Sequence, residues 1–293
     1  MIVEDRIAAL PIWRGTPTIA PLHGGLSNES YLATDATGKY VVRIGTDFPF
    51  HHVYREREAM TARAAHAAGF AGEVVHSEPG LMVVRYIEGK VFDAADMRAN
   101  IERIAHTVRR FHDTMGAHIS GAGFIFWPFH VIRDYARTLR HSRNPAVARL
   151  PALLLVNKTL EATQTPLPIV FGHHDFLPAN IIDDGARLWI IDYEYAGFGT
   201  AMFDLANLSS NAGFSASESE RLLAAYFGAA PSDATRKSHA AMQCASLLRE
   251  ALWGMVSEMF LAAPGVDYDA YARDNLARFD AAHGAYAATY HRG

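Results

Sequence analysis

The spacing of apolar residues changes near residue 90, and this change limits the folds open to the chain. Residues 17–44 alternate apolar and polar positions and are broken at Gly24-Gly25 and at residues 35–38, which predicts a meander of three strands. From residue 94 onward the apolar period is about 3.6, as on one face of a helix. The first such face carries Ile101, Ile104, Val108 and Phe111. A strand-rich part followed by a helical part predicts an α+β fold.

A helix and a hairpin complete the strand-rich part. Residues 52–68 are rich in Ala, Glu and Arg and are followed by Gly69, a residue type favoured directly after a helix. Two further apolar segments, 74–76 and 81–87, flank a Glu-Pro-Gly turn and predict a hairpin. The order predicts a small five-stranded antiparallel sheet with one helix inserted after its third strand.

The chain is therefore expected to divide into residues 1–89 and residues 90–293, joined tightly near residues 86–90. The second part is mainly helical and is interrupted once, between residues 168 and 192. There, short apolar runs flank an Asp-Gly turn at residues 184–185, which predicts one short hairpin inside the helical part. Helices are expected to resume at about Phe203, Glu218, Ser238 and Tyr268.

Charge and cysteine content exclude several classes of partner. The chain has 27 basic and 31 acidic residues and no basic block, which argues against nucleic acid as a partner. Its single cysteine, Cys244, excludes an internal disulfide and cysteine-rich metal sites, and fits a reducing cytoplasm. Residues 1–13 contain acidic residues and Pro11, unlike a signal peptide, and no apolar run is long enough for a membrane span. Small-molecule substrates are expected, and the oligomeric state is left open.

The most informative segments are G-H-H-D-F-L-P-A-N at residues 172–180 and I-I-D-Y-E-Y at residues 190–195. Phosphoryl transfer requires a carboxylate near the attacking hydroxyl group and oxygen ligands for Mg²⁺. Asp175 is expected to orient the acceptor hydroxyl and take its proton, while Asn180 and Asp192 hold the metal. Asp and Asn also occur at turns and strand ends for structural reasons alone. The combination of all three favours the catalytic interpretation.

These motifs resemble those of the aminoglycoside phosphotransferase and choline kinase superfamily, which shares the protein-kinase fold. D-Y-E-Y at residues 192–195 and F-D-L-A-N at residues 203–207 resemble the choline/ethanolamine kinase family in particular. The resemblance implies a two-lobed fold in which residues 1–89 bind the nucleotide and residues 90–293 carry the catalytic loop and the acceptor pocket. It also implies ATP as co-substrate, Mg²⁺, and transfer to an alcohol group. His173 is expected to brace the catalytic loop, and Glu194 joins the candidate metal ligands.

The resemblance also assigns a nucleotide site. Residues 23–28, H-G-G-L-S-N, occupy the place of the phosphate-covering loop. Arg43, on the third strand, stands where protein kinases carry a phosphate-binding lysine, and Glu58 is chosen over Glu56 as its helix partner. The hinge is expected at residues 85–87. The full candidate set is Gly25, Ser27, Asn28, Arg43, Glu58, Arg85, Tyr86 and Ile87.

The acceptor pocket is less clearly defined by the resemblance. A quaternary ammonium group is held by aromatic faces and nearby carboxylates, and the candidates are Tyr195, Trp253, Glu194 and Glu250. The alternative for Trp253 is a structural role in the hydrophobic core. Asn211 replaces a pocket glutamate of animal choline kinases, and Glu250 replaces a second tryptophan. Thiamine, another amino alcohol or an aminoglycoside are therefore alternative acceptors, and a nucleotide-binding pseudokinase is the alternative from a different class.

Overall fold

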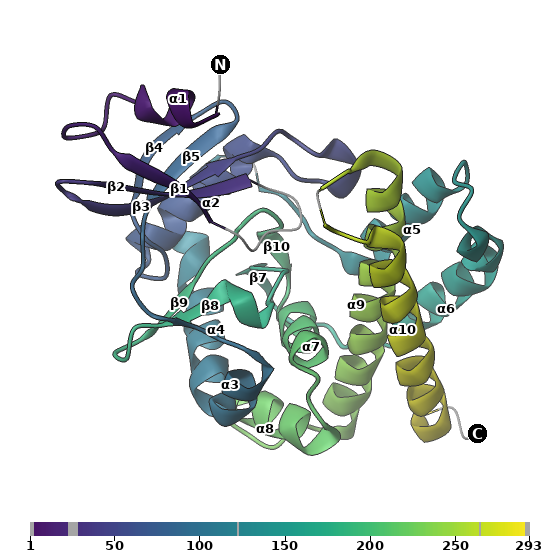
Figure 1. The fold of residues 1–293 in the computed structure, drawn as a ribbon. Coiled ribbons are helices and arrows are strands. Elements are labelled where there is room, and N and C mark those ends of the chain that lie inside the picture. Colours follow the sequence, from purple (N-terminus) through teal and green to yellow (C-terminus); the bar gives the residue numbers. More distant parts are fainter. Residues whose placement is uncertain (1–2, 23–28, 122, 264, 291–293) are drawn as a thin grey trace.

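The computed structural model describes residues 3–22, 29–121, 123–263 and 265–290 (Figure 1). Its N-terminal part is an antiparallel sheet in the order β1-β2-β3-β5-β4, with α2 inserted after β3. The elements are α1 (Val3–Ala8), β1 (Thr18–Leu22), β2 (Glu29–Asp35), β3 (Gly38–Ile44), α2 (Arg55–Ala67), β4 (Val74–Glu78) and β5 (Leu81–Arg85). The predicted sheet and its inserted helix are confirmed. The phosphate-loop prediction for Gly25, Ser27 and Asn28 falls outside the described residues.

The C-terminal part is mainly helical, as predicted (Figure 1). Its helices are α3 (Ala94–Ala99), α4 (Ile101–Met115), α5 (Pro128–Leu139), α6 (Leu150–Ala162), α7 (Ala201–Ala212), α8 (Ala216–Phe227), α9 (Asp233–Phe260) and α10 (Tyr268–Tyr290). Helices α9 and α10 run side by side along one edge of the molecule, and α7 also packs on α9. In the described ranges, no helix is long and apolar enough to cross a membrane.

The interruption of the helical part is more elaborate than the single hairpin predicted. Strands β8 (Ile181–Asp183) and β9 (Leu188–Ile190) form that hairpin, but β6 (Lys90–Val91) pairs with β8, and β7 (Ile169–Gly172) pairs with β10 (Gly197–Thr200). The two added strands, β6 and β10, are too short to show an alternating pattern, and β10 contains two glycines. Gly89 allows the close approach before β6, because a Cβ atom there would lie 2.6 Å from the carbonyl oxygen of Asp183.

Strand alternation gives the sheet two different faces. Tyr40 and Val42 point into a small core beneath α1, whereas Val41 and Arg43 line a cavity on the opposite face. The buried alanines of α2 belong to the large core of the helical part. Helix α2 therefore ties the sheet to the helices, and the division at residue 89 stays a prediction.

Phe111 on α4 connects the segments that position the cavity. Its ring is fully buried and lies 5.2 Å from the ring of Phe70, between centroids, and 6.3 Å from that of Tyr193. It also meets the ring of Phe176 at 6.5 Å. A single side chain thus packs against the loop after α2, the segment after β9 and the segment after β7.

We expect Phe111→Ala to lower the free energy of unfolding by about 3–5 kcal/mol, because it leaves a cavity where three segments meet. Denaturant unfolding measures the change. Leu155→Ala on α6 is the control, since Leu155 is 67% exposed and its truncation should change stability by about 0.5 kcal/mol or less. Equal effects of the two substitutions would contradict the connecting role of Phe111.

Candidate active site

A cavity of about 380 Å³ lies between the sheet and the β8–β9 hairpin. The predicted hinge lines it, as do Arg43, Glu58, Asn180 and Asp192. The N–H of Tyr86 donates to the carbonyl of Lys39 (2.9 Å), and the N–H of Arg85 donates to the carbonyl of Glu73 (2.8 Å). The hinge is therefore fixed to the sheet.

Arg43 lies at the centre of a charged cluster on this cavity. Its guanidinium lies 3.0 Å from the Glu58 carboxylate and 2.8 Å from that of Asp192. Arg55 pairs with the same glutamate at 2.6 Å and with Glu194 at 3.0 Å. Burial opposes the charge on Arg43, but the three carboxylates around it, those of Asp192, Glu58 and Glu194, hold its pKa above the usual value. The expected pairing of Arg43 with Glu58 is present, and the cluster joins β3, α2 and the segment after β9.

The loop after β7 is held by a buried carboxylate on α7. Asp204 accepts hydrogen bonds from the backbone N–H groups of His173 (2.8 Å) and His174 (2.7 Å). The Nε2 atom of His112 lies 2.8 Å from the same carboxylate. Burial alone would raise the pKa of Asp204, but the neighbouring histidines lower it to about 2. Asp204 thus stays charged and sets the direction of the loop backbone, including the positive φ of 64° at His174.

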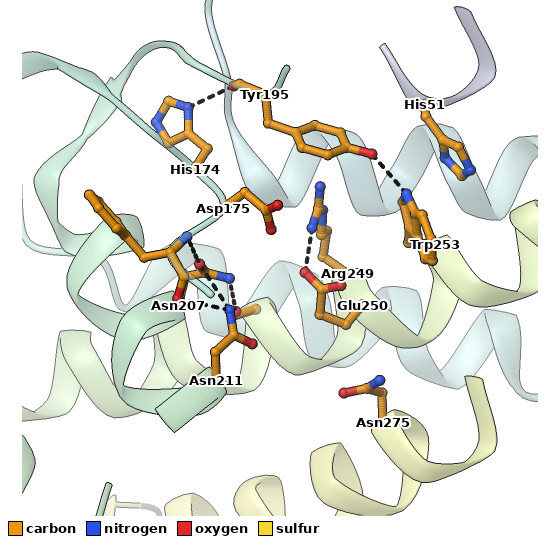
Figure 2. A network of polar contacts seen from close by, with 12 residues as sticks. His51, His174, Asp175, Tyr195, Asn207, Asn211, Arg249, Glu250, Trp253 and Asn275 are labelled. Atoms are coloured by element: carbon orange, nitrogen blue, oxygen red, sulfur yellow. Dashed lines mark hydrogen bonds and ion pairs between the residues drawn. The ribbon is translucent and has the colours of Figure 1, made fainter. Parts of the chain in front are cut away.

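Two asparagines of α7 hold the next turn of this loop. Asn207 accepts a hydrogen bond from the N–H of Phe176 at 2.7 Å. Asn211 donates to the carbonyl of Phe176 and to the side-chain oxygen of Asn207, both at 3.2 Å (Figure 2). The structure therefore places Asn211, a candidate for the acceptor pocket, against the loop backbone, where it bonds to Phe176 and to the Asn207 side chain that also holds the loop.

The three residues predicted to be catalytic, Asp175, Asn180 and Asp192, lie close together, and Asn180 and Asp192 line the cavity. The side-chain amide of Asn180 donates to the carbonyl of Asp175 at 2.8 Å, and the carbonyl of Asn180 accepts from the N–H of Ile191 at 3.0 Å. Asp192 follows directly, with a positive φ of 69°. His173 joins the two segments, because its Nε2 lies 2.9 Å from the carbonyl of Ile191 and its Nδ1 accepts from the N–H of Asp175. It contacts backbone groups, as a bracing residue would.

Asp175 is half-buried on the acceptor side of the loop. Its pKa is raised well above the usual value, first because burial disfavours the charged form and then because the carboxylates of Glu250, Asp192 and Glu194 lie nearby. Arg249 opposes this shift. A raised pKa makes the carboxylate a stronger base, which suits it to accept the proton of a hydroxyl group.

The side-chain oxygens of Asp192 and Asn180 suit a Mg²⁺ ion that is also bound by the phosphates of a nucleotide. Mg²⁺ is usually bound by one or two carboxylates together with substrate phosphates, and Asp192 and Asn180 offer such a partial set. Across the described residues, no group of three His, Cys, Asp or Glu side chains is arranged to hold a metal by itself. Glu194, the third predicted metal ligand, is paired with Arg55 and lies 3.9 Å from Arg43.

Three of the acceptor candidates, Tyr195, Glu250 and Trp253, lie in the region of Asp175 (Figure 2). The indole N–H of Trp253 donates to the hydroxyl of Tyr195 at 2.8 Å, and the ring of Trp253 stacks on that of His51 with centroids 5.0 Å apart. Glu250 is engaged on both oxygens, by the guanidinium of Arg249 and by the hydroxyl of Tyr271 (2.8 Å). The predicted aromatic and acidic groups are neighbours, but each already has a partner within the chain.

Several residues of the site were not singled out from the sequence. Asp204 and Asn207 were noted only within a family motif, and their bonds to the catalytic loop connect residues about thirty positions apart. Arg55, which pairs with Glu58 and Glu194, was not assigned a role. Arg249 was missed, although a charged residue inside the apolar stretch Leu247–Trp253 was a usable signal.

We expect Asp204→Asn to lower the free energy of unfolding by about 3–5 kcal/mol at neutral pH, because it breaks a buried charge network. The wild-type contribution is present above the ordinary pKa of 3.8 and is lost as the pH falls towards about 2, so the variant should show a weaker acid dependence. Urea unfolding from pH 7 to pH 2 measures both effects. Asp113→Asn, at an exposed site on α4, is the control. Equal stability of Asp204→Asn and wild type would refute this role.

Comparison with known proteins agrees with this geometry. Residues 18–242 match the model of the phosphotransferase enzyme family. A choline/ethanolamine kinase family protein from Mesorhizobium loti has a solved structure that is 32% identical, with a TM-score of 0.76 over 95% of this chain and 92% of that one. Choline kinase LicA from Streptococcus pneumoniae shares the fold, with a TM-score of 0.78 and 23% identity over 97% of this chain and 98% of that one.

Curated relatives match over a smaller part. Protein LicA from Haemophilus influenzae is 25% identical over 211 residues, which are 69% of this chain and 61% of that protein. Ethanolamine kinase 2 from Homo sapiens is 26% identical over 196 residues, which are 62% of this chain and 50% of that protein. The chain thus spans between half and two thirds of the length of these two relatives. The family match and the Mesorhizobium relative establish that the chain is a phosphotransferase of the choline/ethanolamine kinase family.

Proposed function

We propose that this protein transfers the γ-phosphoryl group of ATP to the hydroxyl group of a small amino alcohol of the choline or ethanolamine kind. The observation that carries the proposal is the convergence of Asp175, Asn180 and Asp192: Asn180 and Asp192 line the cavity, and the side-chain amide of Asn180 donates to the carbonyl of Asp175. Tyr195, Glu250 and Trp253, three of the acceptor candidates, lie near Asp175 and do not line that cavity. The names of the relatives, which include ethanolamine kinase 2 and choline kinase LicA, support the acceptor class.

The nucleotide is assigned to the cavity under the sheet. The adenine base would lie against the hinge at Arg85, Tyr86 and Ile87, and Arg43 would bind the phosphates while Glu58 holds its guanidinium. Gly25, Ser27 and Asn28 would cover the phosphates. A solved structure of LicA in complex with AMP supports adenine-nucleotide binding by this fold.

In the proposed reaction, the acceptor oxygen attacks the γ-phosphorus, the bond from that phosphorus to the oxygen of ADP breaks, and the hydroxyl proton passes to a carboxylate oxygen of Asp175. Mg²⁺ bound by Asn180 and Asp192 would neutralise charge on the phosphate oxygens. The chain's own contribution is positioning: Asp204 and Asn207 fix the loop, so the Asp175 side chain is held towards the acceptor. His173 keeps the Asp175 and Asp192 segments in register.

The acceptor would be bound by Tyr195, Trp253, Glu194, Glu250 and Asn211 in this proposal. Trp253 is only 6% exposed, so its contribution would depend on the small part of its surface that is not covered by the chain. One screen distinguishes this function from the alternatives. These are thiamine or an aminoglycoside as the acceptor, and a pseudokinase without turnover. The screen measures ATP consumption with choline, ethanolamine, thiamine and aminoglycosides, and choline or ethanolamine is expected to give the highest rate.

We expect Asp175→Asn to reduce turnover at least about a hundredfold, because a positioned proton acceptor contributes roughly 10² to 10⁴ in rate. The amide keeps the shape, so ATP affinity and melting temperature should change little. Steady-state kinetics measures turnover, and calorimetry measures ATP affinity and the melting temperature. Asp280→Asn, at a surface ion pair with Arg149, is the control. Wild-type turnover in Asp175→Asn would remove Asp175 from the mechanism and favour a different base.

For Asp192→Ala we expect ATP affinity in the presence of Mg²⁺ to fall at least about tenfold, because a metal ligand is lost. Without Mg²⁺ the variant and the wild type should bind ATP alike, since Arg43 keeps its partner Glu58. Isothermal titration with and without Mg²⁺ provides the comparison. An equal loss in both conditions would instead assign Asp192 to orienting Arg43.

A further inference from the structure

His174, the residue directly before the proposed base Asp175, is a fully buried side chain to which the proposed reaction gives no role. Its backbone has a φ of 64°, which is unfavourable for a residue with a Cβ atom and easily adopted by glycine. The hydrogen bond from its N–H to Asp204 requires this backbone but no side chain. A histidine at this position therefore indicates that the imidazole ring itself has a function.

The imidazole ring lies in a closely shaped pocket. It stacks on the ring of Phe126, with centroids 4.4 Å apart and an interplanar angle of 14°. Its Nε2 atom faces two glycines of the paired strands β7 and β10. A Cβ atom at Gly172 would lie 2.5 Å from Nε2, and one at Gly199 would lie 2.9 Å from it. The pocket thus depends on two positions without side chains, and a larger residue at either would displace the ring.

The ring makes its hydrogen bond towards the acceptor side of the site. Its Nδ1 atom lies 3.2 Å from the main-chain carbonyl oxygen of Tyr195 (Figure 2). A carbonyl oxygen only accepts, so Nδ1 carries the proton and donates. Burial lowers the pKa of His174 to about 4, so the ring is neutral at pH 7 and has this single N–H. In the part of the chain that the structure describes, Nε2 has no hydrogen-bond partner.

This bond connects the proposed base to the segment of an acceptor candidate. Asp175 follows His174 in the chain, and Tyr195 is the residue whose carbonyl the ring holds. The preceding carbonyl, that of Glu194, accepts a hydrogen bond from the guanidinium of Arg57 on α2 at 3.0 Å. Two successive carbonyls of this segment are thus held by side chains from other segments. The one provided by His174 links the segment directly to the catalytic loop.

We propose that His174 is a positioning residue, whose Nδ1–H bond to Tyr195 keeps the acceptor segment at a fixed place relative to the carboxylate of Asp175. The inference rests on the proposed function and adds to it a residue that was not among the predicted site residues. Loss of the bond would misplace the acceptor hydroxyl, and small misplacements of a reacting group are costly in rate. His174 does not line the cavity assigned to the nucleotide, so ATP binding should be unaffected.

Three substitutions in the full chain separate the bond from the backbone and from the bulk of the ring. His174→Asn tolerates a positive φ, and its amide nitrogen is bonded to Cγ as Nδ1 is in histidine. His174→Leu is branched at the same carbon but donates no hydrogen bond. His174→Gly adopts the backbone without strain and has no side chain. The three therefore retain the donor, the bulk and the backbone respectively.

We expect His174→Leu and His174→Gly to lose at least about fivefold in kcat/KM for choline or ethanolamine, the size of one hydrogen bond. His174→Asn should stay within about threefold of wild type, because it restores the donor. The KM for ATP should be unchanged in all three variants. Hydrogen exchange of residues 193–197 gives a readout without turnover, and it should be faster in the Leu and Gly variants and close to wild type in the Asn variant.

His239→Leu is the matched control for the loss of a buried histidine. His239 lies on α9 with 3% of its surface exposed, and its Nε2 lies 3.2 Å from the hydroxyl oxygen of Ser209. Its substitution should lower the melting temperature, but it should leave both Michaelis constants and the exchange of residues 193–197 as in wild type. Melting curves of every variant confirm that it is folded at the assay temperature.

The proposal is overturned if His174→Gly matches wild type, because the backbone conformation alone would then suffice, or if His174→Asn is as impaired as His174→Leu. A parallel loss for ATP and acceptor would also contradict it. The proposed function is judged separately. If the wild type phosphorylates neither choline nor ethanolamine, the proposed function fails, and hydrogen exchange still decides whether His174 holds the Tyr195 segment.

Discussion

The buried carboxylate of Asp204 is the interaction on which the site depends. It receives two backbone N–H groups of the catalytic loop and lies within hydrogen-bond distance of His112, so one side chain of α7 fixes the loop after β7. The positive φ of His174 is an unfavourable conformation for a residue with a side chain, and it persists because these bonds compensate for it. Asp175 is held in its position by the same bonds, since it follows His174 directly.

A second constraint joins the sheet to this loop. Arg43 links Glu58 on α2 to Asp192 beyond β9, and Arg55 links the same glutamate to Glu194. Removing charges from water is costly, so a cluster of this kind is retained only where several partners compensate for the loss. In this protein Arg43, Glu58 and Asp192 of the cluster line the cavity between the sheet and the β8–β9 hairpin. Positioning of charge is also what phosphoryl transfer requires most from a protein.

The residues predicted to bind the acceptor are already in contact with other side chains of the chain. Tyr195, Trp253 and Glu250 are close together, but the chain fills their binding faces with its own groups: Arg249, His51 and Tyr271. Membership of the choline/ethanolamine kinase family indicates the reaction class, but it does not describe these contacts. Among them is the buried Arg249, which pairs with Glu250 and lies over the ring of Tyr195.

The sequence by itself determined the architecture. The five-stranded sheet, its inserted helix and the helical second part could all be predicted, because strands and helices impose different periods on the apolar residues. The motif around Asp175, Asn180 and Asp192 predicted phosphoryl transfer, because few reactions need those three groups together. Only the tertiary structure decided three other features. Strand β6 pairs with β8, and β7 pairs with β10. Asp204 and Asn207 support the loop after β7, and Arg249 contacts both Tyr195 and Glu250. These contacts join residues far apart in the chain, and their energies depend on burial and on neighbouring charges, which a linear pattern does not encode.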